Sequence, residues 1–355
     1  MAYGRFLTAV LAAPILLAGL SGCYYLHVAG GQMDLLQARV PIARILADPG
    51  ADAELKRRLA RVRLARLWAV TTLGLPDNAS YTGYADLHRD EAVYNVLATP
   101  EFSLAPRQEC FLVVGCLAYQ GYFRRDLAER RAAELRDQGY DVHVGGAVAY
   151  STLGWFDDPV LNGMLRWSDA VLLETLFHEL AHQQLFIDGD TRFNESYAEF
   201  VGQQGLQAWR QAHPQDAIGW DARLLERQRQ FRDRVLTTRA QLEALYAEPL
   251  AAPAMRARKA EILAALVRDH AALRDGPWGG WRGYEAWFAE GPLNNARLLP
   301  FGLYEEDVPA FAQLFEASGR DWRRFHAAAR ELSRQPPAAR AARLAALKAM
   351  GAPAP

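Results

Sequence analysis

The feature that most limits the fold is a group of ionisable side chains inside an apolar segment. His178, Glu179 and His182 form the pattern H-E-x-x-H. The apolar residues around them are Leu172, Leu173, Leu176, Phe177, Leu180, Leu185 and Phe186. This composition predicts a mostly buried helix from Ser168 to Ile187. Because buried imidazoles and carboxylates are costly unless they are paired or bind an ion, we expect this helix to carry the functional site.

The spacing of the two histidines fits a metal site. Residues four apart on an α-helix lie about 40° apart around the axis and about 6 Å along it, so His178 and His182 can present both imidazoles to one ion. Glu179 lies beside them and can take a proton from water that the ion activates. The ligand types favour zinc over other divalent ions. The alternative is a pair of hydrogen-bonded histidines in the core, without a metal.

A catalytic zinc site also needs a third protein ligand. A second helix is predicted from Asn194 to Trp209. In an antiparallel hairpin, Glu195 lies level with His182 and is the expected third ligand. Glu199 lies one turn further, where its carboxylate can accept a hydrogen bond from the other ring nitrogen of His178. The alternatives are exchanged roles for the two glutamates, or two surface acids without metal contact.

The rest of the pattern predicts an α+β fold in which helices predominate. Strands are expected at 93–98, 110–117 and 142–148, with a helix at 124–139, so a small mixed sheet lies beside the two metal-site helices. A long charged helical hairpin is expected at 206–274, with a break at 249–253.

The two ends of the chain are less regular. Before the first strand, two antiparallel helices are expected at 31–74, broken at Asp48-Pro49-Gly50, with an irregular loop at 76–90. Further helices are expected from about 284 and 307. The tail from Pro336 is rich in Ala, Arg and Pro, and we expect it to fray.

The first residues have the pattern of a secretory signal. Arg5 is followed by an apolar run from Phe6 to Leu20, which is short for a bilayer span and lacks a stop-transfer pattern. The sequence Leu20-Ser21-Gly22-Cys23 resembles the cleavage site of bacterial lipoproteins, which implies a lipid on Cys23. The alternatives are an ordinary signal peptide with an incidental cysteine, and a transmembrane anchor.

The remaining cysteines are Cys110 and Cys116. A secreted chain lies in an oxidising compartment, where an even number of cysteines suggests a disulfide. A fully extended strand would hold these two too far apart, but Gly115 can supply a bend. Two buried thiols are the alternative.

Several motifs together resemble known families. The pattern H-E-L-A-H followed by N-E-x-x-A-E-F is similar to that of the gluzincins, zinc peptidases with two histidine ligands and one glutamate ligand. A closer resemblance is to a family of bacterial aminopeptidases that are often lipoproteins. The motifs that carry it are G-C-Y-Y-L at 22–26, C-F-L-V-V-G-C at 110–116, A-Y-S-T-L-G-W-F-D-D-P at 149–159 and L-N-N-A-R-L at 293–298. The resemblance implies His178, His182 and Glu195 as ligands and Glu179 as general base.

Peptide hydrolysis also needs a hydrogen-bond donor for the oxyanion, usually outside the metal ligands. Tyr304 is the first candidate, followed by Tyr284 and His270, and packing in the core is the alternative role for each of them.

Substrate-binding residues are not assigned by the sequence. The segment 145–153 is a candidate edge strand that would pair with an extended substrate backbone. Asp157 and Asp158 are candidates for binding a free amino group, but Asp157-Asp158-Pro159 is more typical of a turn at the start of a helix.

These observations divide the chain into five segments. We expect a lipoprotein-type signal peptide at 1–22, an N-terminal helical segment at 23–90, a zincin-like catalytic core at 91–210, a helical region that closes the site at 211–335 and a flexible tail at 336–355.

The expected function is that of a zinc metallopeptidase with one ion, acting as an aminopeptidase on short peptides. We expect it in the bacterial cell envelope, facing the periplasm and anchored through Cys23, with the outer membrane as one location. Because 40 Lys and Arg nearly balance 41 Asp and Glu, no nucleic-acid partner is expected, and no obligate protein partner is predicted. The alternatives are a zinc endopeptidase, and a non-catalytic envelope lipoprotein whose helical hairpin binds a partner.

Overall fold

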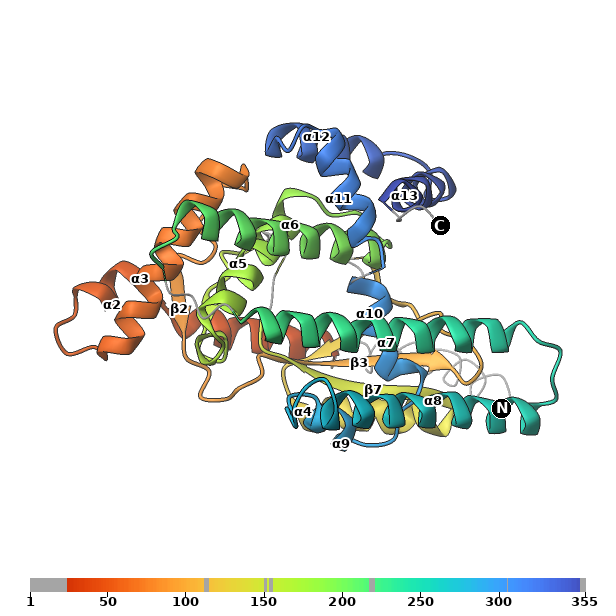
Figure 1. Cartoon of the computed structure of the whole chain (residues 1–355). Coiled ribbons are helices and arrows are strands. Elements are labelled where there is room, and N and C mark those ends of the chain that lie inside the picture. The colour runs from red at the N-terminus through yellow and green to blue at the C-terminus, as the bar shows by residue number, and fades with distance from the viewer. Residues whose placement is uncertain are drawn as a thin grey trace, which may run out of the picture.

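The computed structural model describes residues 24–111, 115–149, 152, 156–216, 221–304 and 306–351. Helices make up most of this part of the chain and the strands form small sheets, which confirms the predicted α+β class with a predominance of helices (Figure 1). In the described ranges, no helix combines the length and the apolar composition that crossing a bilayer requires.

The strands are short and occur in the first half of the chain. Their bounds are β1 Arg39–Pro41, β2 Gly83–Ala85, β3 Val93–Pro100, β4 Glu109–Phe111, β5 Gly115–Leu117, β6 Gln120–Tyr122, β7 Tyr140–Ala147 and β8 Val160–Leu161.

Helices lie before, between and after these strands. An N-terminal helix spans 24–37. The others up to the metal motif are α2 Ile42–Ala47, α3 Ala53–Trp68, the π-helix η1 Ala69–Leu73, α4 Arg125–Asp137, the 3-10 helix η2 Met164–Arg166 and α5 Asp169–Gln184. The later ones are α6 Thr191–Ala212, α7 Ala222–Tyr246, α8 Ala252–Asp275, α9 Glu285–Ala289, α10 Asn295–Tyr304, α11 Val308–Ala317, α12 Trp322–Ser333 and α13 Pro337–Gly351.

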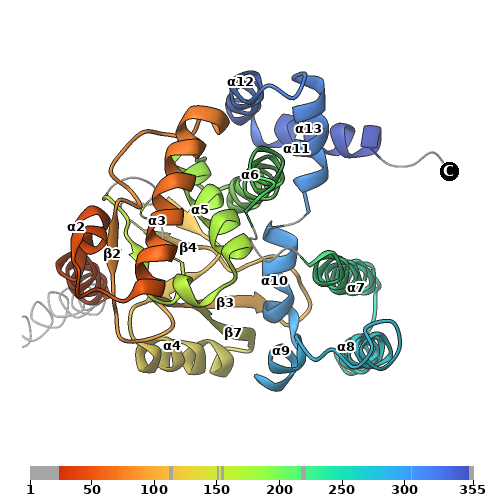
Figure 2. The same cartoon turned by 60° about the vertical axis from the view of Figure 1, so that its left-hand side comes forward.

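The sheet formed by β6, β3 and β7 has β3 at its centre and is antiparallel throughout. In its register, Val93 pairs with Ala147 and Pro100 pairs with Tyr140. The apolar face of α4, which includes Ala128 and Ala132, packs against β3 and β7 (Figure 2). A second sheet has the order β1-β2-β8, and β4 and β5 form a separate hairpin. The sheet order places β7 at an edge.

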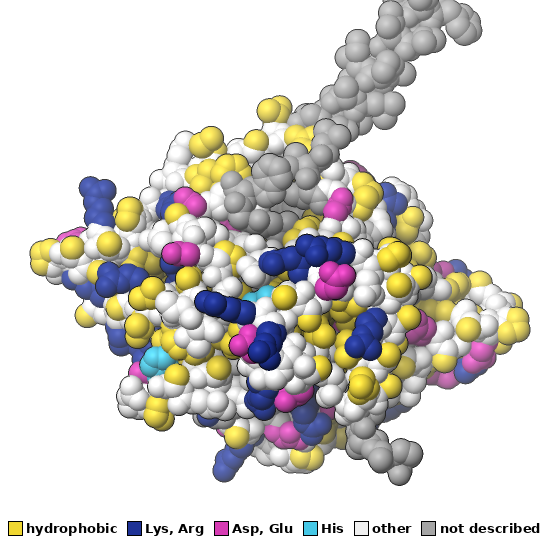
Figure 3. All heavy atoms as spheres, turned by 90° about the horizontal axis from the view of Figure 1, so that it is seen from above, with side chains coloured by type: hydrophobic (Ala, Val, Ile, Leu, Met, Phe, Trp, Pro, Cys, Tyr) yellow, Lys and Arg dark blue, Asp and Glu magenta, His cyan; other side chains and the backbone are white. Residues whose placement is uncertain are grey.

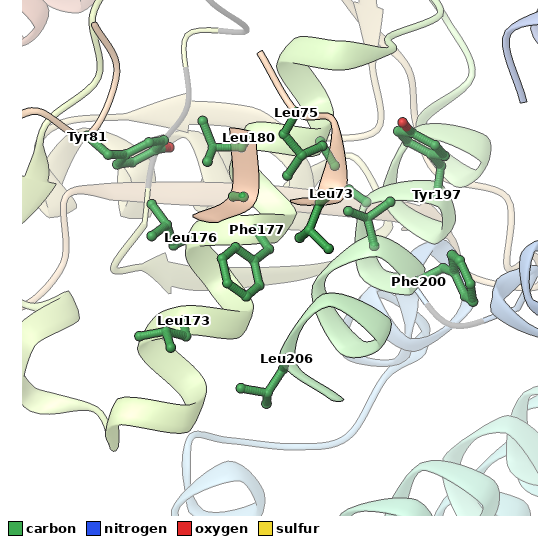
Figure 4. Packing of buried hydrophobic residues seen from close by; sticks show 14 of the residues in the cluster. Leu73, Leu75, Tyr81, Leu173, Leu176, Phe177, Leu180, Tyr197, Phe200 and Leu206 are labelled. Atoms are coloured by element: carbon green, nitrogen blue, oxygen red, sulfur yellow. The ribbon is translucent and has the colours of Figure 1, made fainter. Parts of the chain in front are cut away.

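The main core lies around α5 and α6, which pack closely against each other. Figure 4 shows its side chains from both helices, together with Leu73 and Leu75 from the segment after α3. Small residues on α6 permit the close contact. A Cβ atom on Gly202 would lie 2.9 Å from the carbonyl oxygen of Glu174 and 3.3 Å from the Cβ of His178. The absence of a side chain at Gly202 therefore brings α6 directly against the backbone of α5.

Local sequence signals explain where these two helices begin. The side chain of Ser168 accepts a hydrogen bond from the backbone N–H of Val171 at the start of α5. Asp190 does the same for Phe193 at the start of α6. Such caps satisfy N–H groups that have no partner within the helix.

The N-terminal segment differs from the expected pair of helices. The region predicted as one helix is divided into the helix at 24–37, strand β1 and α2, because Arg39–Pro41 pairs with β2. Pro41 has no N–H to continue a helix and stands directly before α2. The expected loop at 76–90 contains strand β2.

The strand expected at 110–117 is also divided. β4 and β5 pair with each other, and Gly115 has a φ of 70°, a left-handed conformation that glycine adopts without strain. This hairpin places Cys110 opposite Cys116, and the two residues form a disulfide.

The charged region 206–274 is a helical hairpin only in its later part. Helix α6, which carries Glu195 and Glu199, continues to Ala212. The hairpin itself consists of α7 and α8, which project together from the body (Figure 1). The chain turns between Tyr246 and Ala252, near the expected break.

The described part of the tail, residues 337–351, does not fray. It forms α13, which buries Arg340, Leu344 and Leu347. Alanine and arginine are strong helix formers, and these three residues lie on one helical face. Figure 3 views the side of the molecule on which α11, α12 and α13 lie, where many Lys and Arg side chains gather. The exposed arginines on and around α12 are Arg320, Arg323, Arg324, Arg330 and Arg334.

A buried histidine fastens α12 to the core. The imidazole of His326 lies 2.8 Å from the carbonyl oxygen of Leu73 and 2.7 Å from the hydroxyl of Tyr197. Because a carbonyl can only accept, Nε2 of His326 donates to Leu73, and Nδ1 accepts from Tyr197. Burial lowers the pKa of His326 to about 4, and the nearby charge of Arg330 acts in the same direction.

The fold should therefore lose stability in acid through His326. Its unfolded pKa is 6.5 and its folded pKa is about 4, so the unfolded state takes up the proton first as the pH falls. Between pH 7.5 and 4.5 we expect a loss of about 2–3 kcal/mol that a His326→Gln variant does not show. The measurement is urea unfolding of both proteins at both pH values. Equal pH dependence of the two proteins would contradict this role.

Candidate functional site

The two helices of the main core bring the metal motif together. α5 carries His178 and His182, and α6 carries Glu195. The two Nε2 atoms of the histidines lie 3.1 Å apart. Oε2 of Glu195 lies 3.4 Å from Nε2 of His178 and 3.3 Å from Nε2 of His182. All three side chains are buried, with at most 8% of each residue exposed.

This triangle of ligand atoms fits the requirements of a zinc ion. Tetrahedral bonds of about 2.0–2.2 Å place neighbouring ligand atoms about 3.3–3.5 Å apart, close to the three measured distances. Two imidazoles and a carboxylate are also a typical donor set for catalytic zinc. Among the described residues, His178, His182 and Glu195 form a group of acidic and histidine side chains that could hold a metal ion.

Glu199 supports the site from the next turn of α6. Its Oε2 lies 3.2 Å from Nδ1 of His178, and its Oε1 accepts a hydrogen bond of 2.8 Å from Gln203. The Nδ1–H of His178 can therefore donate to Glu199 while Nε2 faces the ligand triangle. Such a contact fixes the orientation of the ring and increases its basicity as a ligand.

The charges within the site shift the pKa values of its ligands. Burial disfavours the charged form of His178, but the carboxylates of Glu195 and Glu199 keep its pKa well above the usual value. Burial likewise acts to raise the pKa of Glu195, yet the neighbouring His182 and hydrogen bonds from both histidines bring it down to about 2. The site thus has a negative carboxylate that attracts positive charge.

Glu179 lies beside the ligands without being one of them. Burial raises its pKa, while His178 and His182 act in the opposite direction. Within the described ranges, its carboxylate forms no hydrogen bond or ion pair. A half-buried carboxylate that lies next to a metal site and has no structural partner is available to exchange protons.

Sequence reasoning missed the network that fastens the end of α5. Gln183 follows His182, and its amide donates hydrogen bonds to Ser80 at 3.1 Å and to Asp158 at 3.4 Å. Its carbonyl oxygen accepts a hydrogen bond of 2.6 Å from Asn78. The polar residues of the loop 76–82 predict a turn. No pattern in the sequence indicates that this turn contacts α5.

The start of α6 is held by residues from the end of the chain. Asp307 is fully buried, receives hydrogen bonds of 2.6 and 3.1 Å from Arg192 on α6, and lies 2.9 Å from Nζ of Lys348 on α13. Arg340 of α13 donates to Asp190, the N-cap residue of α6, with distances of 2.7 and 2.9 Å. The contacts at Asp307 and Asp190 therefore both stabilise the first turn of α6, which carries Glu195.

The other predicted site residues lie in different surroundings. Tyr304 is the last residue of α10, and its side chain is not among those described. Tyr284 stacks on Phe231 at 3.7 Å and His270 stacks on Phe288 at 4.3 Å, both in an aromatic cluster of α7, α8 and α9.

The two aspartates considered for amine binding have structural partners. Asp157 forms an ion pair of 3.3 Å with Arg39. Asp158 is buried and accepts hydrogen bonds from the backbone and the hydroxyl of Thr152, in addition to that from Gln183. Asp157 and Asp158 therefore make structural contacts, and strand β8 follows them in place of the expected start of a helix.

The cysteines fall into two groups. Cys23 lies outside the described residues. The hairpin closed by Cys110 and Cys116 contacts the turn between α5 and α6, where the N–H of Cys116 donates to Asp188 at 3.3 Å.

Comparison with known proteins gives one result. A family model with the description "Putative aminopeptidase" matches residues 23–344, which include all residues of the candidate site. No curated protein and no solved structure matches the chain significantly.

The contact at Gly202 should control the geometry of the site. In Gly202→Ala, the new methyl group would meet the Glu174 carbonyl and His178, so α6 must move away from α5. We expect a loss of about 1–3 kcal/mol in the free energy of unfolding and weaker binding of a divalent metal ion. Denaturant unfolding and metal titration followed by calorimetry measure the two effects.

The matched control is Gly30→Ala. Gly30 also lies in a helix, but a Cβ atom there meets nothing within 4 Å. This variant should be as stable as the wild type or more stable by up to about 1 kcal/mol. If Gly202→Ala behaved in the same way, close packing at this position would not be what holds the ligands.

Proposed function

Because the chain belongs to this aminopeptidase family, we propose that it is a zinc-dependent peptidase that removes residues from the amino end of short peptides. The observation that carries the zinc dependence is the triangle of His178, His182 and Glu195, whose edges of 3.1, 3.3 and 3.4 Å suit one tetrahedral ion. Membership of the family supports peptidase activity in general.

In the proposed reaction, the ion would act as the Lewis acid and Glu179 would transfer the proton. A zinc ion in this site supplies Lewis-acid chemistry, which activates water and polarises a peptide carbonyl. Glu179 accepts a proton as the water oxygen attacks the carbonyl carbon. It then transfers that proton to the leaving nitrogen as the C–N bond breaks, so the carboxylate is regenerated. Glu199 keeps the imidazole of His178 oriented throughout.

Substrate alignment along β7 is part of the proposal. β7 lies at the edge of its sheet and ends at Ala147, within the segment expected to pair with an extended peptide. Backbone pairing of this kind places a peptide without selecting its side chains. Tyr304, at the end of α10, is the proposed donor to the oxyanion.

We also propose that the protein is a lipoprotein of the bacterial envelope, anchored through Cys23 and facing the periplasm. The support is the sequence Leu20-Ser21-Gly22-Cys23 together with the disulfide between Cys110 and Cys116, a bond that persists in oxidising compartments. The mass of the N-terminal peptide from purified protein tests the anchor.

Replacement of the general base tests catalysis. Glu179→Gln keeps the size of the side chain but cannot accept a proton, so we expect kcat to fall by about 100-fold or more while bound zinc stays equimolar. A peptide library read by mass spectrometry, together with elemental analysis, measures both. Glu243→Gln, the same change at an exposed position on α7, is the matched control and should keep full activity. Undiminished hydrolysis by a zinc-loaded Glu179→Gln protein would disprove the mechanism.

The choice of an aminopeptidase over an endopeptidase is tested with blocked peptides. An aminopeptidase binds the free ammonium group, and the loss of a hydrogen-bonded charge typically reduces kcat/KM at least about tenfold. We therefore expect acetylated peptides to be cleaved much more slowly than their free counterparts of the same sequence. Equal rates for the two sets would instead assign an endopeptidase.

A further inference from the structure

The N-terminal helix at 24–37 has an unusual outer face. Its exposed residues recur at helical spacing: Tyr25, Leu26, Ala29, Gly30, Met33, Asp34 and Gln37. Leu26 is 75% exposed and Met33 is 53% exposed. No charged residue occurs on this face before Asp34. The outer face of a surface helix is normally polar, so an apolar face over the first three turns calls for a covering surface.

The inner face of the same helix is fastened rigidly to the body. The hydroxyl of Tyr24 donates to the carbonyl of Gly121 at 3.0 Å, and Nε2 of His27 accepts from the N–H of Phe123 at 3.1 Å. Gly31 lies so close to Phe123 that a Cβ atom would overlap its ring. The helix therefore cannot turn its apolar face inward.

The position of the apolar face in the chain indicates what covers it. The residue that precedes Tyr24 is Cys23, the proposed site of the lipid, so no linker separates the anchor from the rigid helix. A lipid on Cys23 would bring the first turns of this helix to the membrane surface.

We propose that the apolar face formed by Tyr25, Leu26 and Met33 lies in the interface of the lipid bilayer and fixes the orientation of the protein on the membrane. This inference rests on the proposed lipid anchor. Tyrosine and apolar side chains are typical of the boundary between head groups and acyl chains.

The size of the face favours a bilayer over a protein partner. Tyr25 and Met33 are eight residues apart, which is about 12 Å along a helix. A stable protein interface buries about 800 Å² on each partner, more than one such stretch of helix can supply. A hollow of about 440 Å³ beside the helix is lined by apolar residues, among them Leu26, Leu87 and Phe123, and by two acids and two arginines, Asp34, Asp86, Arg89 and Arg124. The apolar surface therefore ends at this mixed, charge-balanced hollow.

The orientation has a consequence for the rest of the molecule. The helix at 24–37, coloured red in Figure 2, lies at the left edge of the body, and α12 and α13 lie at the top. With the helix on the membrane, the arginine-rich side around α12 is not the side that meets the bilayer.

The test uses the full-length protein reconstituted in vesicles of phosphatidylethanolamine and phosphatidylglycerol. A spin label is attached to Leu26→Cys or Met33→Cys, and the controls are Val267→Cys on α8 and Met350→Cys on α13, whose native side chains are also exposed. Collisions with oxygen report lipid, and collisions with a water-soluble nickel chelate report solvent. We expect oxygen collisions to exceed nickel collisions several-fold at Leu26 and Met33, and the reverse at both controls.

Solvent contact at all four positions would overturn the proposal. Shielding of Leu26 and Met33 from both reagents, with spin–spin broadening that grows with protein concentration, would overturn it in favour of a second copy of the chain. The same shielding without broadening would overturn it in favour of another protein.

The N-terminal mass of the same sample separates this inference from the anchor. A lipidated Cys23 with both labels in water would leave the anchor standing and disprove the membrane face. An unlipidated protein whose labels enter added vesicles would disprove the anchor and support the face. An unlipidated protein with labels in water would overturn both.

Discussion

The close packing of α5 against α6 is the constraint on which the other features of this protein depend. The metal motif requires atoms from two helices to meet within about 3.5 Å. Helices with large side chains between them are usually 8–10 Å apart, so small residues at the contact are needed for a tighter approach. Gly202 supplies this on α6, and the apolar residues on both helices make the same contact the centre of the core. Stability and site geometry are therefore determined by one interface.

The sequence allowed the centre of the site to be predicted because its residues are local to two helices. The spacing of His178 and His182 and the position of Glu195 after a short turn follow from helix geometry alone. The supports of the site could not be found in this way. Gln183 meets Ser80 and Asn78 across about a hundred residues, and Arg192 meets Asp307 from a similar distance in the chain. Contacts between segments so far apart leave no periodic pattern in a single sequence.

The errors of prediction have related physical causes. Composition alone predicts a frayed tail after Pro336, although Arg340, Leu344 and Leu347 have the spacing of a buried helical face. The apolar period predicts a helix in the N-terminal region, but Arg39–Pro41 pairs with β2, a partner that the period does not reveal. In both cases a tertiary contact decided the outcome. The position of Tyr304 on α10 is known, whereas its role stays a prediction.

The contacts of α13 link the metal motif to a helix that is distant in the sequence. Arg340 and Lys348 complete the charge pairs of Asp190 and Asp307 at the start of α6. When α13 is displaced, each of these acids loses a partner although no ligand has been changed. The affinity of the site for a metal ion is therefore coupled to the docking of a helix that touches none of the three ligands.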